Sequence, residues 1–457
     1  MLTPEILLAF ILAAPLLVFL LLSLGWLAGL QIGERTTVRI TAGAFVSSTV
    51  AVLLLAFNMS SNDWSPIVVD FGDWFSAGEY RFPLQLLVDS LSLPLLGLSV
   101  VVAGLIGSFS SRYLHRDRGF FRFFLLLHLF AFGAELAFTA GSADLLIAGW
   151  ELVGLTSVLL IAFFDERTAP VRNALRTFAV YRITDVGLLI GVFFLHHAAG
   201  SSSWGMLFGG DWPRQSTELS TGVATAVALL FLFAAAGKSA QAPFSGWLPR
   251  AMEGPTPSSA LFYGAIAVHL GVYLLLRCEP LLQASSVAPT AVVIIGLITA
   301  LHATLSGRAA ADAKTSLAFA ALAQLGVIFV EVGLGFGRVA LYHLIGHAAI
   351  RTLQFLRAPS MLHDYHRVHA AAGGALPKTG THYEKMLPIG FRRWMYRFAL
   401  DRSHLDTFIE RFFAAPVVRS AKHIAALERG DETRPRVSED PLPAELITTK
   451  VAGGLDA

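Results

Sequence analysis

The sequence has 457 residues, of which 55% are hydrophobic and only 14% are charged, and its formal net charge is +2. These proportions exclude an ordinary soluble domain and place the chain among polytopic membrane proteins, and the small net charge suggests no nucleic-acid partner. A single cysteine, Cys278, excludes an internal disulfide framework and a protein-ligated iron–sulfur centre, so we expect no redox cofactor and no metal site.

Apolar stretches of about 20 residues, long enough to cross a bilayer, follow one another along most of the chain. The first is too long for the core of a signal peptide and has no basic flank before it, so we interpret it as a retained span. The expected fold class is an all-α polytopic membrane protein with about eleven transmembrane helices. They are expected at residues 5–30, 38–58, 88–110, 119–140, 143–164, 175–197, 221–241, 257–277, 287–307, 313–335 and 338–356.

Basic residues gather on alternate connections between these helices, as the positive-inside rule describes for cytoplasmic loops. They follow the odd-numbered spans, whereas the intervening connections are acidic or nearly uncharged. We therefore expect a multi-pass protein of the inner cell membrane, with its N-terminus outside and its C-terminus in the cytoplasm. The basic residues are Arg35, Arg39, Arg112, Arg116, Arg118, Arg122, Arg167, Arg172, Arg176, Arg250 and Arg308.

The tail after residue 357 is basic and contains no further span long enough to return across the membrane. Its stretches 387–400 and 405–429 mix Arg and Lys with Phe, Trp and Leu. This pattern is typical of interfacial helices, and equally of cytoplasmic helices that dock on a partner. Residues 430–457 are expected to be disordered.

Ionisable side chains inside the spans are the candidate functional residues, because each costs about 2.5–3.5 kcal/mol at the bilayer centre and must face a partner or water. Lys238 ends the seventh span, and four prolines follow it. Prolines interrupt helical hydrogen bonding, and broken helices at membrane depth are tolerated where they line a polar cavity. We therefore interpret Lys238 as a buried proton switch; the alternative is an ordinary helix end near the lipid headgroups. The remaining candidates are Glu135, Glu151, His269, Lys314, Glu331, His343 and His347.

The eleventh span has the sharpest local pattern. His343, His347 and Arg351 stand at i, i+4 and i+8, on one face of a helix. A file of imidazoles inside a membrane suits a proton relay, because imidazole exchanges protons near neutral pH. The alternative is that these histidines only hydrogen-bond neighbouring helices.

A family resemblance runs through residues 80–357. The stretches that carry it are, in order, DSLSLPLL, GWELVGLTSVLLIAFF, RITDVGLLI, AAGKSAQAPFSGWLPRAMEGPTPSSAL, GVYLLLR, DAKTSLAFAALAQLGVIF and HLIGHAAIRTLQFL. Together they resemble the antiporter-like L subunit of respiratory complex I. This subunit belongs to a wider proton-translocating family, which includes Mrp antiporter subunits and the membrane partner of the DAB inorganic-carbon pump.

The resemblance implies roles for individual residues. Glu151 matches a glutamate that pairs with the lysine of a broken helix, here Lys238. Asp185 and Arg182 match the pair thought to modulate these two charges from the neighbouring subunit's side. Lys314 looks like the central lysine of a hydrated polar axis along the membrane midplane, which His343 and His347 continue.

The sequence departs from the family pattern in three places. Tyr263 stands where the family usually has a histidine, and His269 lies nearly two turns further on. Arg351 replaces a lysine and effectively never deprotonates, so a relay must pass around it or use it as a fixed charge. The second repeat, which in the family continues into another broken helix, is expected to be incomplete here and to be completed by a companion subunit.

The expected organisation follows from these patterns. Two N-terminal helices (1–60) precede an external loop (61–87), the first antiporter-like repeat (88–277) and a partial second repeat (278–357). A cytoplasmic or interfacial tail (358–429) and a disordered end (430–457) follow.

The function that this reading predicts is proton translocation through a buried Glu/Lys/His axis, by a membrane subunit of a complex-I-like, NADH:quinone oxidoreductase-type assembly. Its partners are other membrane subunits, the bilayer and protons or Na⁺. The alternatives are a subunit of an inorganic-carbon uptake complex or of an Mrp-type cation/proton antiporter, and a degenerate scaffold that does not conduct. HExxH, G-x-S-x-G and dinucleotide motifs are absent from the sequence, so at most it is a non-redox translocase subunit.

Overall fold

The computed structural model describes residues 3–30, 32–78, 80–310, 312–371 and 386–405, with isolated positions between 407 and 423. Side chains are described within these ranges except at 359–369 and 371. Residues 1–406 form one compact unit, and residues 407–457 form a second. The expected helix at 405–429 and the tail at 430–457 lie almost entirely outside the described residues.

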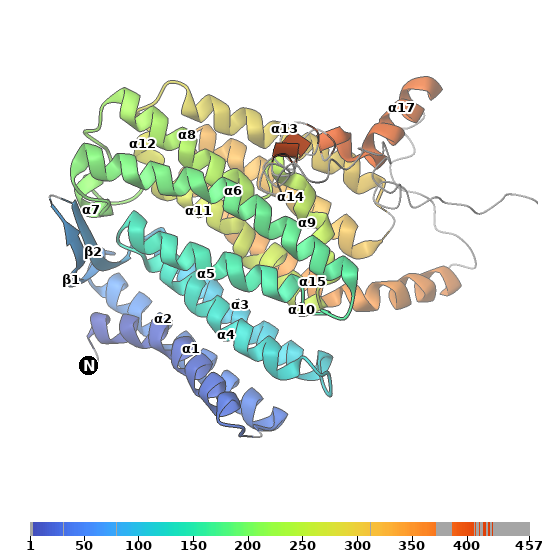
Figure 1. Cartoon of the computed structure of the whole chain (residues 1–457), viewed down its shortest axis with the longest axis horizontal. Helices are drawn as coiled ribbons and strands as arrows, with labels where there is room; N and C mark the ends of the chain where they lie inside the picture. Colours follow the sequence, from blue (N-terminus) through green and yellow to red (C-terminus); the bar gives the residue numbers. More distant parts are fainter. Residues whose placement is uncertain are drawn as a thin grey trace, which may run out of the picture. The chain divides into compact units, whose positions relative to one another are not determined.

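Long helices make up most of the first unit (Figure 1). Among the described residues, ten helical segments are long and apolar enough to cross a membrane, which confirms the polytopic helical fold. They are α1 (Pro4–Leu27), α2 (Glu34–Ser61), α3 (Ser92–Tyr113), α4 (Phe120–Thr139), α5 (Ala143–Ile161), α6 (Thr168–Ala199), α8 (Thr221–Lys238), the composite segment Thr256–Arg277, α13 (Ala288–Arg308) and α14 (Ala313–Gly333).

The eleventh expected span, 338–356, lies inside a longer helix, α15 (Gly337–Ala371). This helix is not among the ten apolar segments. It packs against α14 and against the irregular middle of segment 256–277. The polar stripe predicted from His343, His347 and Arg351 therefore belongs to a helix that is packed within the bundle.

The chain after α8 is irregular, as the prolines predict. The helix ends at Lys238, and Ala240 two residues later adopts a left-handed conformation with φ of 52°. Short turns follow instead of a continuous helix. They are η1 (Phe244–Gly246), α9 (Trp247–Arg250) and η2 (Ala251–Glu253).

The eighth span, expected as a regular helix at 257–277, is broken as well. It consists of α10 (Thr256–Ser259), a π-helical turn η3 (Ala260–Ala265), a 3₁₀ turn η4 (Ala267–His269) and α11 (Leu270–Arg277). Its most apolar 18-residue stretch is wholly buried, so it runs through the centre of the bundle. Irregular backbone at membrane depth is tolerated only where protein or a cavity surrounds it. The helix α12 (Glu279–Gln283) follows it.

Residues 61–87 were expected to be a loop, but they contain a β-hairpin. Strand β1 (Ile67–Ala77) pairs antiparallel with β2 (Tyr80–Val88), from Ile67 opposite Val88 to Ala77 opposite Tyr80. The register shifts between positions 70 and 75. Charged residues and a glycine interrupt the apolar residues of β1, and several of its large apolar side chains, among them Phe71 and Trp74, are exposed, so hydropathy alone gave no signal for the hairpin. Isolated bridges join it to residues 140 and 201, which lie near the short helix α7 (Trp204–Leu207).

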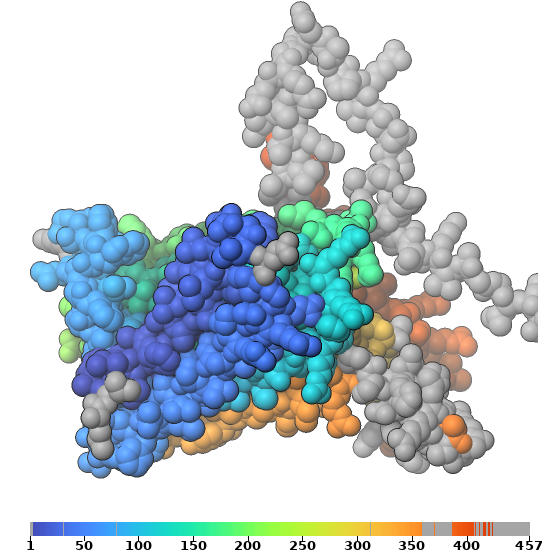
Figure 2. All heavy atoms as spheres, turned by 90° about the horizontal axis from the view of Figure 1, so that it is seen from below, coloured from blue at the N-terminus to red at the C-terminus, as the bar shows by residue number. Residues whose placement is uncertain are grey.

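Large apolar side chains remain exposed along the outer helices. Examples are Leu21 on α1, Phe57 on α2 and Phe193 on α6, each more than 60% exposed. Figure 2 shows one such face, where the side chains of the N-terminal helices form a continuous surface. In a soluble protein a surface of this kind would cause aggregation, but here it faces the acyl chains of the bilayer.

The stretch 387–400, expected either as an interfacial helix or as a cytoplasmic helix that docks on a partner, forms α17 (Ile389–Leu400), followed by the turn η5 (Arg402–His404). Both pack on α13.

Candidate functional site

Lys238 is the centre of the first polar cluster. It is the last residue of α8, but its side chain is fully buried and is therefore not exposed to lipid headgroups. The Nζ atom donates a hydrogen bond to the carbonyl oxygen of Trp150 at 3.0 Å. It also lies 4.7 Å from the ring centroid of Trp150 and 4.4 Å from that of Tyr181, where the negative ring faces stabilise a cation.

Two glycines make room for this amine. A Cβ atom at Gly154, on α5, would lie 2.8 Å from Lys238 Nζ. A Cβ at Gly237, next to the lysine, would lie 2.0 Å from the hydroxyl oxygen of Thr184 on α6. The close approach of α5, α6 and α8 around Lys238 therefore depends on residues without a side chain.

Two carboxylates share one arginine beside the lysine. Arg182 Nη2 donates to Asp185 Oδ2 at 2.8 Å and also pairs with Glu151. Asp185 accepts a second bond from Trp150 Nε1 at 2.6 Å and is almost completely buried. Glu151 and Arg182 are partly exposed, with 30% and 40% of their side chains accessible. The cluster therefore extends from the core to the lateral surface of the bundle.

The expected pairing of Glu151 with Lys238 is not direct. No described carboxylate forms an ion pair with Lys238 Nζ, although Asp185 and Glu151 both act on it electrostatically. Arg182 occupies both carboxylates because a guanidinium presents several donors at once. The backbone of Trp150, which precedes Glu151, supplies the contact with the lysine.

Aromatic side chains connect this cluster to α9 and to the π-helical turn η3. The ring of Trp247 lies 5.1 Å from that of Tyr181 and 5.9 Å from that of Tyr263. Its Nε1 donates to Gly237 O at 3.0 Å, which ties α9 to the end of α8. Tyr263 is buried, and its hydroxyl donates weakly to Ala251 O at 3.4 Å. Tyr263 thus packs beside the cluster without a charged partner among the described residues.

Lys314, on α14, contacts the irregular stretch between α8 and α10. Its Nζ donates to Met252 O and Gly254 O, both at 3.0 Å. These carbonyls lie where the helix is interrupted and have no intrahelical partner. The lysine is only partly buried. The structure therefore places Lys314 at the break after α8, separate from the Lys238 cluster.

The histidines form a second cluster between segment 256–277 and α15. His269 Nδ1 lies 2.8 Å from Ala265 O, which can only accept, so that nitrogen carries the proton and Nε2 accepts. His347 Nδ1, 2.9 Å from this Nε2, is then a donor. Its own Nε2 accepts from Arg351 Nε at 3.4 Å. The hydrogen bonds thus run in one direction, from Arg351 through His347 and His269 to the backbone, with both imidazoles neutral.

His343 has different partners. Its Nδ1 lies 2.8 Å from Glu331 Oε1 and its Nε2 lies 3.1 Å from Gln324 Oε1. Both nitrogens face oxygen atoms, so this imidazole can donate from each. The ring centroids of His343 and His347 are 6.4 Å apart, without a hydrogen bond between them. The predicted stripe is therefore two neighbouring groups with different hydrogen-bonding states.

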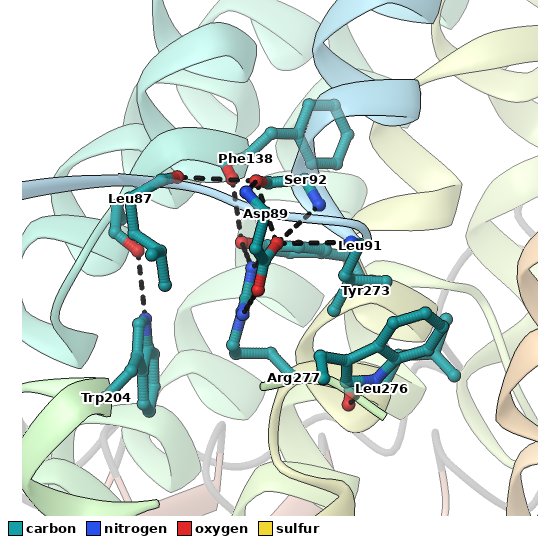
Figure 3. Close-up of polar contacts among 11 residues, drawn as sticks. Leu87, Asp89, Leu91, Ser92, Phe138, Trp204, Tyr273, Leu276 and Arg277 are labelled. Atoms are coloured by element: carbon teal, nitrogen blue, oxygen red, sulfur yellow. Dashed lines mark hydrogen bonds and ion pairs between the residues drawn. The ribbon is translucent and has the colours of Figure 1, made fainter. Parts of the chain in front are cut away.

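One buried ion pair was not predicted, although its members stand in two of the stretches that carry the resemblance. Asp89 follows β2, and Arg277 ends α11. Figure 3 shows the Asp89 carboxylate facing the Arg277 guanidinium, with Nη1–Oδ2 and Nη2–Oδ1 distances of 2.5 and 3.0 Å. Asp89 also caps α3 by accepting from the backbone of Leu91 and Ser92. Tyr273 bridges Arg277 to Phe138 O.

Two other polar groups have no predicted role. Glu135 on α4 is fully buried, and neither of its carboxylate oxygens has a partner among the described residues. His196 Nε2 lies 2.9 Å from Asp144, which also accepts from Ser202. Glu135 was among the ionisable residues predicted inside the spans, but nothing in the local sequence distinguishes it from those whose side chains have partners.

The arrangement suits proton movement better than bond-making chemistry. Lys238 and the histidines can gain or lose protons, whereas Arg182 and Arg351 act as fixed charges. Among the described residues no group of three or more His, Cys, Asp or Glu side chains could hold a metal ion. Within the described part of the chain, no hydrogen bond joins the Lys238 cluster, Lys314 and the histidine cluster, so any proton transfer between them needs water or movement.

Comparisons with known proteins agree with the family resemblance of the sequence motifs. Residues 142–379 match the family described as NADH:quinone oxidoreductase/Mrp antiporter, TM, and residues 74–124 match NADH-Ubiquinone oxidoreductase (complex I), chain 5 N-terminus. NADH-ubiquinone oxidoreductase chain 5 of Neurospora crassa is 32% identical over 73% of this chain and 46% of its own length. The Allomyces macrogynus chain 5 is 32% identical over 78% of this chain and 54% of its own. The chain thus spans about half the length of the curated relatives it matches.

Two solved structures share the fold. The Mrp complex from Dietzia sp. DQ12-45-1b matches with a TM-score of 0.64 and 26% identity, over 78% of this chain and 37% of that chain. The membrane-bound sulfane sulfur reductase, an archaeal respiratory membrane complex, matches with a TM-score of 0.62 over 76% of this chain and 70% of that chain. The latter is only 18% identical, so it supports the fold alone.

Proposed function

The chain belongs to the NADH:quinone oxidoreductase/Mrp antiporter family of membrane proteins, and we propose that it is a proton-translocating subunit of a complex-I-like assembly, of the antiporter-like L type. One observation carries the proposal. A fully buried lysine ends a broken helix and touches the backbone beside a Glu–Arg–Asp cluster. An ionisable residue inside the membrane is costly, and a proton-transfer role accounts for keeping it there.

The proton step centres on Lys238. Its charged form is stabilised by the Trp150 carbonyl, by two aromatic rings and by the nearby acids. Arg182 opposes it, because a second cation in the cluster repels the ammonium. A shift of Arg182 toward the lateral surface, together with Glu151, strengthens the field of Asp185 on the lysine and favours proton uptake. The return of Arg182 favours release. Since Glu151 and Arg182 are partly exposed, a neighbouring subunit can drive this shift.

The continuation of the path uses the second cluster. A proton leaving Lys238 passes by water along the broken segment, where Lys314 orders the free carbonyls. The neutral His269–His347 pair then accepts it, because a chain of neutral imidazoles transfers a proton by exchanging donor and acceptor roles. Arg351 stays charged and sets the direction of the hydrogen bonds. The basic loops are placed on the cytoplasmic side of the inner membrane by the positive-inside rule, with the N-terminus outside.

The test uses the intact assembly, purified through a tag on this chain and reconstituted into vesicles with a pH-sensitive dye inside. Lys238→Met is expected to lower proton flux about 100-fold or more, the range for loss of a general acid–base group. Lys238→Arg keeps the positive charge, but a guanidinium does not release its proton, so this variant should also fail to conduct. Asp73→Asn, on the exposed hairpin, is the matched control. Unchanged flux in Lys238→Met would falsify the proposal, and full activity of Glu151→Gln would favour a non-conducting scaffold.

A second candidate is cation/proton exchange in an Mrp-type complex, which the likeness to the Dietzia Mrp complex favours. The same vesicles distinguish the two. An imposed Na⁺ gradient should drive proton movement only in an exchanger. Identification of the chains that co-purify provides an independent answer, because quinone-binding and iron–sulfur subunits accompany a respiratory complex.

A further inference from the structure

Two cavities lie near basic ends of helices. One, of about 1020 Å³, lies at the start of α4 and is lined by Arg118 and Arg122. Each of these has an acidic partner, Glu166 at 3.9 Å and Asp165 at 2.8 Å, so the charges balance. The other, of about 760 Å³, lies between the C-terminal end of α13 and α17. The second cavity differs in its charge.

Four arginines line the second cavity: Arg308 at the end of α13, and Arg392, Arg393 and Arg397 on α17. None of the described residues that line it is acidic. Apolar side chains, among them Leu305 and Tyr396, complete the wall. A pocket with several guanidinium groups and an apolar side suits a ligand that has phosphate oxygens and a hydrocarbon part, because guanidinium binds phosphate through paired hydrogen bonds.

The helix that supplies three of these arginines has the character of an interfacial helix. Phe391, Trp394 and Tyr396 are each about half exposed, and Ile389 is 60% exposed. Aromatic residues next to arginines are typical of the headgroup region of a membrane. The helix is also fixed in place, because His302 Nδ1 on α13 lies 2.9 Å from the hydroxyl of Ser403, just after α17.

The position of the cavity identifies the source of the phosphate. Arg308 ends a transmembrane helix, and by the positive-inside rule it lies at the cytoplasmic surface. Basic pockets between helices at that surface bind anionic lipid headgroups. Moreover, α17 begins at Ile389, beyond residue 379, where the match to the family ends.

We propose that this cavity binds the phosphate-bearing headgroup of an anionic phospholipid, with α17 lying along the membrane surface. The lipid anchors α17 to the end of α13. The proposal depends on the membrane fold and not on proton translocation.

The experiment measures lipid binding to the purified assembly by native mass spectrometry, with phosphatidylglycerol or phosphatidylcholine added in increasing amounts. The wild-type protein should retain phosphatidylglycerol in preference to phosphatidylcholine. Arg392→Gln/Arg397→Gln should bind phosphatidylglycerol about 30-fold more weakly, because each basic residue near an anionic surface contributes about a fivefold gain. Arg35→Gln/Arg39→Gln removes the same charge from exposed positions on the same side and should change binding less than threefold.

Two further arms separate the alternatives. Arg392→Lys/Arg397→Lys should restore most of the binding, since lysine also binds phosphate. Inorganic phosphate at millimolar concentration should not displace the lipid. Equal losses of phosphatidylglycerol binding in the two double glutamine variants would mean that only general surface charge attracts lipid, and this would overturn the proposal. Displacement by inorganic phosphate, or binding of phosphate without a lipid preference, would assign the site to a soluble anion instead. An unchanged melting temperature in both pairs shows that folding is intact.

Discussion

The buried pair Asp89–Arg277 allows a prediction about stability that does not depend on the transport proposal. The pair joins the start of α3 to the end of α11, and Arg277 is fully buried. Asp89→Asn keeps an oxygen that can cap α3, but its amide group faces the donors of Arg277 and leaves that charge unpaired. Removing one member of a buried ion pair costs about 3–5 kcal/mol in unfolding free energy.

A double-mutant cycle tests this value. Arg277→Met should cost a similar amount, and the double variant should cost about as much as either single one, since the first change already removes the interaction. Ser92→Ala is the control. It loses the hydroxyl's bonds to the backbone and to the carboxylate of Asp89 but leaves the ion pair in place, and it should cost about 1.5 kcal/mol. Unfolding free energies in detergent or nanodiscs provide the measurement.

The pH dependence gives an independent check. Burial by itself would raise the pKa of the Asp89 carboxyl, but Arg277 and the donors of Ser92 outweigh it and keep the pKa below its ordinary value. The stabilising contribution is therefore fully present above about pH 4 and is lost as the pH falls further. Wild-type protein should lose this contribution in acid, and Asp89→Asn should not. The reasoning is refuted if the single variants are additive, or if Asp89→Asn costs no more than Ser92→Ala.

Three further outcomes are expected. Gly154→Val should displace the Lys238 amine and reduce proton flux in vesicles at least tenfold, whereas Gly222→Val, in open space at the start of α8, the helix that carries Lys238, should not. Glu135→Leu should raise the unfolding free energy by about 1–3 kcal/mol, because it removes a buried carboxyl that has no partner among the described residues; a lower melting temperature would contradict this expectation. Lys314→Met should cost about 3 kcal/mol, since it leaves two carbonyls without their donor, and an unchanged unfolding free energy would contradict that role.

The sequence determined the features that depend on local composition. Runs of apolar residues set the spans, because the bilayer requires a fixed length of apolar helix. The prolines after Lys238 set the irregular stretch that follows α8, because their ring removes a donor wherever they stand. The spacing of His343, His347 and Arg351 also follows from the sequence alone, because residues four apart lie on one face of a helix.

Only the tertiary structure decided which polar groups meet. Glu151 was expected opposite Lys238, but Arg182 takes its carboxylate, and the lysine bonds to the backbone of Trp150. Asp89 and Arg277 stand 188 positions apart along the chain, and each alone resembles an ordinary residue at the end of a span. Their pairing depends on how whole helices pack and rotate, and hydropathy does not encode that rotation. Local composition therefore determines where charges enter the membrane, and the packing of the helices determines which charges neutralise one another.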